Sequence, residues 1–210
     1  MDFELPTIYP ITDTRLSGLS HAEQVELLAA GGATLIQLRD KDASPRDFYD
    51  QAVAAIRVAR SKNVRVIIND RVDIALCAGA DGVHLGQDDM PTAAARGVLG
   101  TNAIIGYSTH NVDQVMEAKE LSIDYLAIGP VFETSTKADP DPAIGLEGLN
   151  AMRELAGDVP VVAIGGINAD NIGVVLAAGA NSAAIIGCLY SEPARIAERL
   201  RTLHGVLNKQ

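Results

Sequence analysis

The feature that most constrains the fold of this chain is a repeated junction. A short apolar run ends, and charged residues or glycines follow at once. The clearest junctions lie at residues 35–41, 64–71, 83–89 and 161–166. If the apolar runs are parallel strands, the clusters that follow them meet at one edge of a sheet, where α/β proteins bind ligands. Cations, carboxylates and a glycine pair at such an edge predict a metal and a phosphorylated ligand.

The spacing of the apolar runs predicts a barrel. We expect strands at residues 8–12, 34–38, 64–68, 82–85, 103–107, 125–128, 161–164 and 183–186. Most of these runs are apolar on both faces, as buried parallel strands are, and amphipathic helical segments alternate with them. Glycines follow several of the helical segments, as at Gly31, Gly79 and Gly179. The pattern favours one (β/α)8 TIM-barrel domain over residues 1–210, with a doubly wound sheet as the alternative.

Composition excludes several classes of partner. The net charge is −10 over 210 residues, which argues against binding to nucleic acid or to an anionic membrane. No apolar stretch reaches the ~20 residues of a membrane span, and the N-terminus has no signal-peptide pattern. We therefore expect a cytoplasmic protein whose partners are small molecules, and a homo-oligomer is left open. Cys77 and Cys188 have no metal or redox spacing, and we predict two buried free thiols.

Two aspartates are the candidate metal ligands. Asp70 follows the third predicted strand and Asp89 follows the fourth, so the two carboxylates are expected to lie close together. Two carboxylates with water and phosphate oxygens suit Mg²⁺, which takes few protein ligands. The alternative is that each aspartate caps the helix that follows it.

A second candidate group alternates along the chain after the second strand. In an extended chain Gln37, Arg39 and Lys41 share one face, with Asp40 turned away. An arginine fork, a lysine ammonium and an amide could clamp a diphosphate. The alternative is a surface ion-pair cluster with Asp40 and Asp42.

The last two strands carry a pattern typical of phosphate sites. Gly165 and Gly166 follow the seventh strand, and Ile186 and Gly187 follow the eighth, where backbone N–H groups can approach a phosphate. Ordinary turn glycines are the alternative.

The long connection at residues 130–145 breaks the regular rhythm. Its Thr134, Thr136 and Lys137 could close over phosphates, or the loop could simply be solvated. Ser108 could bind a ligand or cap its strand. Among the histidines, His84 is expected to be structural, His110 is open, and His21 and His204 are expected at the surface.

Taken together, the clusters resemble the thiamine-phosphate synthase family. The motifs occur in order at residues 37–41 (QLRDK), 68–70 (IND), 84–89 (HLGQDD), 106–110 (GYSTH), 129–137 (GPVFETSTK) and 163–167 (AIGGI). The resemblance extends from about Tyr9 to Tyr190. It implies a Mg²⁺-dependent transferase that joins 4-amino-2-methyl-5-(diphosphooxymethyl)pyrimidine to 4-methyl-5-(2-phosphooxyethyl)thiazole. The products are thiamine phosphate and diphosphate, and the family is thought to react by a dissociative route.

The resemblance also implies roles for individual residues. The pyrimidine diphosphate would be held by Gln37, Leu38, Arg39, Asp40, Lys41 and Asn69, and Mg²⁺ by Asp70 and Asp89. Ser108 and Lys137 would contact the diphosphate, so that Arg39, Lys41, Ser108 and Lys137 are the implied catalytic residues. The thiazole phosphate would be held by Thr134, Ser135, Thr136, Gly165, Gly166, Ile186 and Gly187.

One departure and two rival functions remain. Gly187-Cys188 stands where the family often has a serine after the isoleucine, and the roles of Cys188 and His110 are open. A thiazole tautomerase is a related barrel, but it carries a histidine where this chain has Pro130, and it has no use for the diphosphate clamp. A non-catalytic sensor of phosphate ligands is the other rival, and turnover distinguishes it.

Overall fold

The computed structural model describes residues 3–134 and 141–208, and its centre is one parallel sheet of eight strands. The strands are β1 (Ile8–Pro10), β2 (Leu35–Leu38), β3 (Arg65–Asn69), β4 (Gly82–Leu85), β5 (Ile104–Thr109), β6 (Tyr125–Ile128), β7 (Val161–Ile164) and β8 (Ser182–Ile185). Their order is β1-β8-β7-β6-β5-β4-β3-β2, and a parallel bridge between Ile11 and Gln37 joins the two ends of the sheet. The (β/α)8 barrel expected from the sequence is confirmed.

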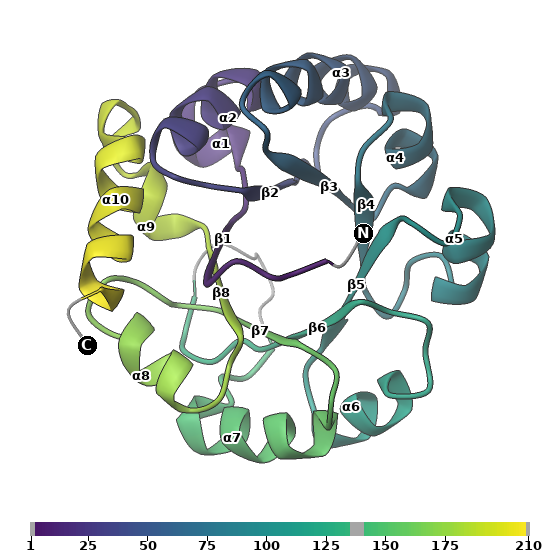
Figure 1. Ribbon diagram of the computed structural model, residues 1–210, viewed down its shortest axis with the longest axis vertical. Coiled ribbons are helices and arrows are strands. Elements are labelled where there is room, and N and C mark those ends of the chain that lie inside the picture. The colour runs from purple at the N-terminus through teal and green to yellow at the C-terminus, as the bar shows by residue number, and fades with distance from the viewer. Residues whose placement is uncertain (1–2, 135–140, 209–210) are drawn as a thin grey trace.

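A ring of helices surrounds the strands (Figure 1). The helices are α1 (Thr14–Ser17), α2 (His21–Ala30), α3 (Pro45–Ser61), α4 (Val72–Ala78), α5 (Thr92–Leu99), α6 (Val112–Ala118), α7 (Gly145–Ala156), α8 (Ile172–Ala177), α9 (Gly187–Tyr190), the 3₁₀ turn η1 (Pro193–Arg195) and α10 (Ile196–Leu207). Local sequence fixes the helix starts. Ser20 and Glu23 form a capping box on α2, and Ser44 caps α3 ahead of a proline in the first turn.

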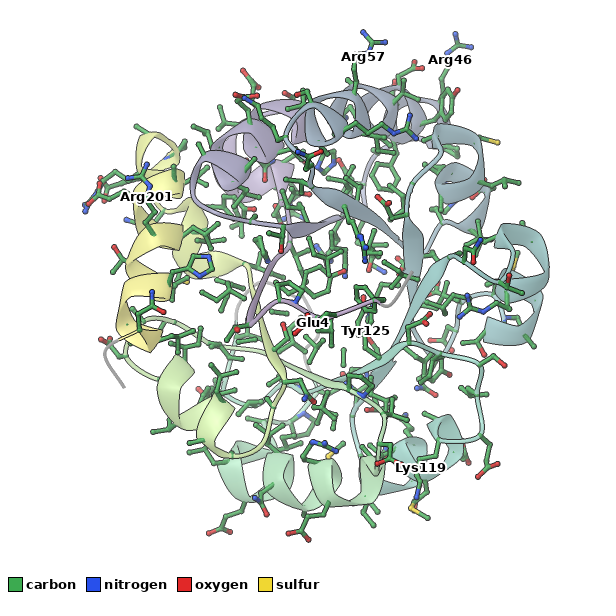
Figure 2. The ribbon with its side chains drawn as sticks, viewed as in Figure 1. Glu4, Arg46, Arg57, Lys119, Tyr125 and Arg201 are labelled. Atoms are coloured by element: carbon green, nitrogen blue, oxygen red, sulfur yellow. The ribbon has the colours of Figure 1, made fainter. Side chains whose placement is uncertain are left out.

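Two apolar layers lie on the two faces of the sheet. On β2, Ile36 and Leu38 point outward into the layer between strands and helices, whereas Leu35 points into the barrel. This is the two-residue alternation of an extended strand. Figure 2 shows Tyr125 lying inside the barrel while Arg57 points outward from α3. Every second side chain along each strand therefore faces the space inside the barrel.

The N-terminal segment closes one end of the barrel. It crosses the barrel opening in Figure 1, and Phe3 and Leu5 pack against the inner layer. The Phe3 ring centroid lies 6.4 Å from that of Tyr125, and the Arg65 guanidinium lies over the Phe3 ring, 5.9 Å from its centroid. The opposite end of the barrel, at the carboxyl ends of the strands, is not covered by this segment.

Two sequence-based expectations about single residues are wrong. Cys77 is exposed on α4, although Cys188 is partly buried as a free thiol. His21 is completely buried, because α2 lays its first turn against Phe48 and against Thr12. His204 is partly exposed, as expected of a surface position, although its Nε2 atom is buried. No helix in residues 3–134 or 141–208 is long and apolar enough to cross a membrane.

Candidate active site

A cavity of about 770 Å³ opens at the carboxyl end of the strands. Every strand contributes to its wall, through Tyr9, Gln37, Asn69, His84, Ser108, Ala127, Ile164 and Ala184. The volume suits one or two small ligands. The position is the one at which barrels of this kind carry their ligand sites.

The end of β2 sends alternate side chains into the cavity. Gln37, Arg39 and Lys41 line it, as predicted. Leu38 points to the outer apolar layer and is fully buried there. Asp40 is turned away as expected, and its carboxylate accepts the backbone N–H groups of residues 42 and 43 at 3.1 and 3.0 Å. Neither Leu38 nor Asp40 lines the cavity, so any contribution of theirs to binding is indirect.

The cations of this segment pair with acids other than those considered from the sequence. A guanidinium nitrogen of Arg39 lies 3.5 Å from Asp13, and the Lys41 ammonium pairs with Asp70. Asp42 pairs instead with Arg15, on the surface. The alternative of a surface cluster joining Arg39 and Lys41 to Asp40 and Asp42 is therefore wrong, and both cations face the cavity.

Asp70 and Asp89 lie in the same cavity wall and do not cap helices. The N-cap positions of α4 and α5 are Arg71 and Pro91, and neither helix has a side-chain cap. Asp89 folds back to accept the Gly86 N–H at 2.7 Å. Asp70 has a φ of +62°, a left-handed conformation that is uncommon outside glycine. That turn redirects the chain at the end of β3, and such local strain is typical of functional positions.

The electrostatics of the two carboxylates fit a cation. Burial and the nearby charge of Asp70 raise the pKa of Asp89, although the Gly86 hydrogen bond opposes the shift. Two carboxylates that disfavour each other's charge are stabilised by a cation between them. Residues 3–134 and 141–208 hold no cluster of three or more His, Cys, Asp or Glu arranged for a metal. This donor set fits Mg²⁺, which can complete its shell with water and phosphate oxygens, better than a metal that needs an all-protein cage.

Ser108 and two histidines complete this side of the cavity. Ser108 Oγ lies 2.8 Å from His84 Nε2, and His84 Nδ1 lies 3.0 Å from the Tyr125 hydroxyl. His84 is satisfied on both nitrogens, as expected of a structural histidine, but it also lines the cavity. Burial lowers the pKa of His84 to about 4. His110 Nδ1 donates to the Gly129 carbonyl at 2.7 Å, which ties β5 to the end of β6.

The wall after β7 and β8 is built from backbone. Gly165 and Gly166 have φ values of +103° and +65°. A Cβ on Gly165 would lie 2.5 Å from Pro130 Cα, and one on Gly166 would lie 2.6 Å from the Glu133 carbonyl oxygen. These glycines therefore let the connection after β6 pack directly against the residues that follow β7. They have a packing role that ordinary turn glycines lack.

The same wall continues through the start of α9. Gly165, Gly166, Ile186, Gly187 and Cys188 all line the cavity. The first N–H groups of a helix have no acceptor within the helix. In α9 the Leu189 N–H bonds to the Ile186 carbonyl at 3.0 Å, so the N–H groups that concern a ligand are those of Gly187 and Cys188. Of the residues expected in the connection after β6, Thr134 lines the cavity. Ser135, Thr136 and Lys137 lie outside the described residues.

Sequence reasoning missed the two tyrosines beneath the site. Tyr9 and Tyr125 line the floor of the cavity, and their hydroxyls lie 3.0 Å apart across the barrel. Both belong to apolar runs, which the sequence pattern interprets only as strands. Gly106 could have drawn attention to them, because a glycine inside a strand often marks a close approach by another group.

The fold and the cavity define a class: a (β/α)8 barrel enzyme whose strand ends combine cations, paired carboxylates and a glycine-lined wall. Comparison with known proteins makes this specific. The family model described as thiamine monophosphate synthase matches residues 8–189. The chain belongs to this family, and it is a transferase of thiamine biosynthesis.

Individual relatives agree over nearly the whole chain. The chain is 42% identical to a thiamine-phosphate synthase of Chloroflexus aurantiacus, over 97% of this chain and 94% of that one. It is 48% identical to that of Clostridium novyi, over 87% and 89%. The solved thiamine phosphate pyrophosphorylase of Pyrococcus furiosus superposes with a TM-score of 0.85 at 36% identity, covering 97% of this chain and 96% of that one.

Proposed function

We propose that the cavity joins a pyrimidine methyl diphosphate to a thiazole phosphate, with Mg²⁺, and releases diphosphate and thiamine phosphate. The observation that carries this proposal is the division of one cavity into two chemically different walls. Charged and polar side chains at the ends of β2 to β5 line one wall, and glycine-rich backbone after β7 and β8 lines the other. Two phosphorylated substrates facing each other need this arrangement.

The charged wall would hold the pyrimidine diphosphate. Gln37 and Asn69 present amides near the cavity floor, where the pyrimidine ring would lie. Arg39, Lys41 and Ser108 lie nearer the mouth and would bind the diphosphate, whose charge increases as it leaves. Lys137 would join them from the connection after β6.

Asp70 and Asp89 would hold Mg²⁺ at this wall. When bound, the metal would supply Lewis-acid stabilisation of the negative charge on the leaving diphosphate. The ion pair between Lys41 and Asp70 already brings a cation to the carboxylates. We expect Lys41 to shift toward the diphosphate once the carboxylates bind the metal.

The glycine wall would hold the thiazole phosphate. Backbone N–H groups near Gly166 and Gly187 would approach its oxygens without an intervening side chain. Thr134, with Ser135 and Thr136, would add hydroxyl donors. Because Gly187 acts through its backbone in this scheme, the missing serine after Ile186 does not impair the site.

The chemistry requires little covalent work from the protein. The bond between the pyrimidine methylene carbon and the diphosphate oxygen breaks, and its electron pair leaves with the diphosphate. The thiazole nitrogen then donates its lone pair to the same carbon and forms the new C–N bond. The electron-rich aminopyrimidine stabilises the intervening cation, so the enzyme's contribution is alignment and stabilisation of the departing charge.

Turnover by the purified protein tests this proposal. With Mg²⁺ and both substrates, equimolar diphosphate and thiamine phosphate should form. Without the thiazole phosphate, no thiamine phosphate should form, and diphosphate should be released only by slow hydrolysis. Binding of both substrates without product would favour a non-catalytic sensor. Isomerisation of a thiazole phosphate without diphosphate release would favour a tautomerase.

A further inference from the structure

A chain of hydrogen bonds crosses the inside of the barrel beneath the cavity. Gln37 Nε2 lies 3.2 Å from the Tyr9 hydroxyl, which lies 3.0 Å from the Tyr125 hydroxyl. Tyr125 lies 3.0 Å from His84 Nδ1, and His84 Nε2 lies 2.8 Å from Ser108 Oγ. Five residues on five strands thus connect the proposed pyrimidine contact to the proposed diphosphate contact.

The packing of the barrel is arranged around this chain. Tyr9 and Tyr125 are 1% and 0% exposed, and their rings meet edge to face at 5.9 Å. The His84 ring stacks on Tyr125 at 5.5 Å. A Cβ on Gly106 would lie 2.1 Å from Tyr125 Cζ and 2.5 Å from His84 Nδ1. β5 therefore lacks a side chain at the point where the tyrosine and the histidine meet.

The hydrogen bonds of the chain can be followed from the first donor. The Gln37 amide nitrogen can only donate, so Tyr9 accepts from it, and in one of two arrangements the Tyr9 hydroxyl donates to Tyr125. Tyr125 then donates to His84 Nδ1, which leaves the imidazole proton on Nε2, where it is donated to Ser108 Oγ. Burial, which lowers the pKa of His84 to about 4, is consistent with a ring that carries one proton.

The opposite direction leaves a buried group unsatisfied. Ser108 would donate to His84 Nε2, and His84 Nδ1 would donate to Tyr125. Tyr9 would then accept from both Gln37 and Tyr125, and its own hydrogen would have no acceptor among residues 3–134 and 141–208. A buried hydroxyl without an acceptor costs stability, so the first direction is favoured.

We propose that Tyr9, Tyr125 and His84 are positioning residues that set the polarity of Ser108. Because Ser108 Oγ accepts from His84, its own hydrogen is free to be donated into the cavity, toward a leaving diphosphate oxygen. In the opposite direction Ser108 would offer only lone pairs to an anionic ligand. This inference rests on the proposed function, in which Ser108 contacts the diphosphate.

The first test removes single hydroxyls from the chain. Tyr125→Phe cuts the link to His84 and should lower kcat about tenfold, the effect of losing one oriented hydrogen bond, with the KM for the thiazole phosphate unchanged. Tyr9→Phe should have a smaller effect, because Tyr125 keeps its link to His84. The matched control is Tyr190→Phe, which removes a buried hydroxyl bonded to the Ile11 carbonyl at 2.8 Å, outside the chain. A loss in Tyr125→Phe no larger than in this control would overturn the proposal.

A double-mutant cycle separates positioning from general damage. In a Ser108→Ala background Tyr125→Phe should change kcat by less than about twofold, because the group that the chain orients is gone. An additive loss in the double variant would overturn the proposal.

A measurement without turnover keeps this inference separate from the proposed function. In ¹⁵N NMR spectra of the full-length protein, the His84 ring should carry its proton on Nε2, and Tyr125→Phe should shift the ring toward a mixture of tautomers. A proton on Nδ1 in the unmodified protein would overturn the proposed direction. If the protein instead makes no thiamine phosphate, the proposed function fails, and the tautomer still reports on the chain.

Discussion

The two walls of the cavity are built from different materials. The wall from β2 to β5 presents Arg39, Lys41, Asp70 and Asp89 as side chains, and each is held by another polar group. The wall from β7 and β8 presents backbone at glycines, with Gly166 packed against the connection after β6. One wall is made of charged side chains, whereas the other is shaped by backbone conformation.

This difference suggests different tasks for the two walls. A leaving diphosphate gains charge during the reaction, so mobile cations and a metal are useful beside it. A thiazole phosphate keeps its charge and only has to be held in line, for which a rigid backbone wall suffices. Substitutions in the first wall should therefore affect kcat, and substitutions in the second should affect the KM of the thiazole phosphate.

The largest effect is expected from Asp70→Asn in the charged wall. Asparagine tolerates the left-handed conformation at this position, so the fold should survive. Loss of one proposed metal ligand should lower kcat about a hundredfold and raise the Mg²⁺ concentration needed for half-maximal rate. Steady-state rates across a Mg²⁺ titration measure both.

Asp73→Asn is the matched control for this substitution. Asp73 lies three residues further on, pairs with Arg71 and does not line the cavity. It should leave the Mg²⁺ dependence unchanged. Equal Mg²⁺ titrations for Asp70→Asn and the unmodified protein would remove Asp70 from the metal site.

An intermediate effect is expected from Gly166→Ala in the backbone wall. The new Cβ would meet the Glu133 carbonyl and Phe132, so the connection after β6 has to move. We expect the KM of the thiazole phosphate to rise about tenfold and stability to fall by about 1 to 3 kcal/mol, with kcat less affected. Kinetics at saturating pyrimidine diphosphate and chemical denaturation measure the two.

Gly18→Ala isolates the cost of backbone strain alone. Gly18 has a φ of +67°, close to that of Gly166, but a Cβ there meets nothing within 4 Å. It should lose stability and keep its kinetics. If Gly166→Ala behaves in the same way, the backbone wall does not position the thiazole phosphate.

The sequence allowed the outer plan of the site to be predicted. Short runs that are apolar on both faces indicate the strands. The residues that follow these runs indicate the edge of the sheet that binds ligands. The alternation of Gln37, Arg39 and Lys41 was correct because an extended chain allows few other arrangements. For Asp70, metal binding and helix capping could not be distinguished from the sequence. The structure argues against capping, because Asp70 has a left-handed backbone conformation and the N-cap of α4 is Arg71.

The inside of the barrel could not be predicted in this way. Tyr9 and Tyr125 are 116 residues apart, and their contact depends on the shape of the closed sheet. Within their own runs the two tyrosines resemble ordinary apolar strand residues. His21 is expected at the surface from the sequence, yet the packing of α2 against β2 and α3 buries it. Contacts of this kind arise from tertiary structure and leave little trace in local patterns.

The smallest effect concerns a buried histidine behind the charged wall. Burial lowers the pKa of His21 to about 4, against the attraction of Asp40 and Asp13. Its Nδ1 atom lies 2.8 Å from the Thr12 hydroxyl, which also accepts the Arg39 N–H at 3.2 Å. The neutral ring thus supports the backbone that carries Arg39, whereas the glycine wall is shaped by backbone conformation and by the close packing of Gly165 and Gly166.

The sign of the pH effect follows from the two protonation states. In the unfolded chain His21 binds a proton below its ordinary pKa of 6.5. In the folded protein it stays neutral until the pH falls to about 4. The free energy of unfolding should therefore fall as pH drops from 6.5 to 4, by up to about 1.4 kcal/mol per pH unit for one group. His21→Asn, which can keep the Thr12 hydrogen bond, should make this slope shallower, and His204→Asn, at a less buried histidine, should change it less. Denaturation curves at several pH values measure the slopes, and an unchanged slope in His21→Asn would mean that the charged wall does not depend on a neutral His21.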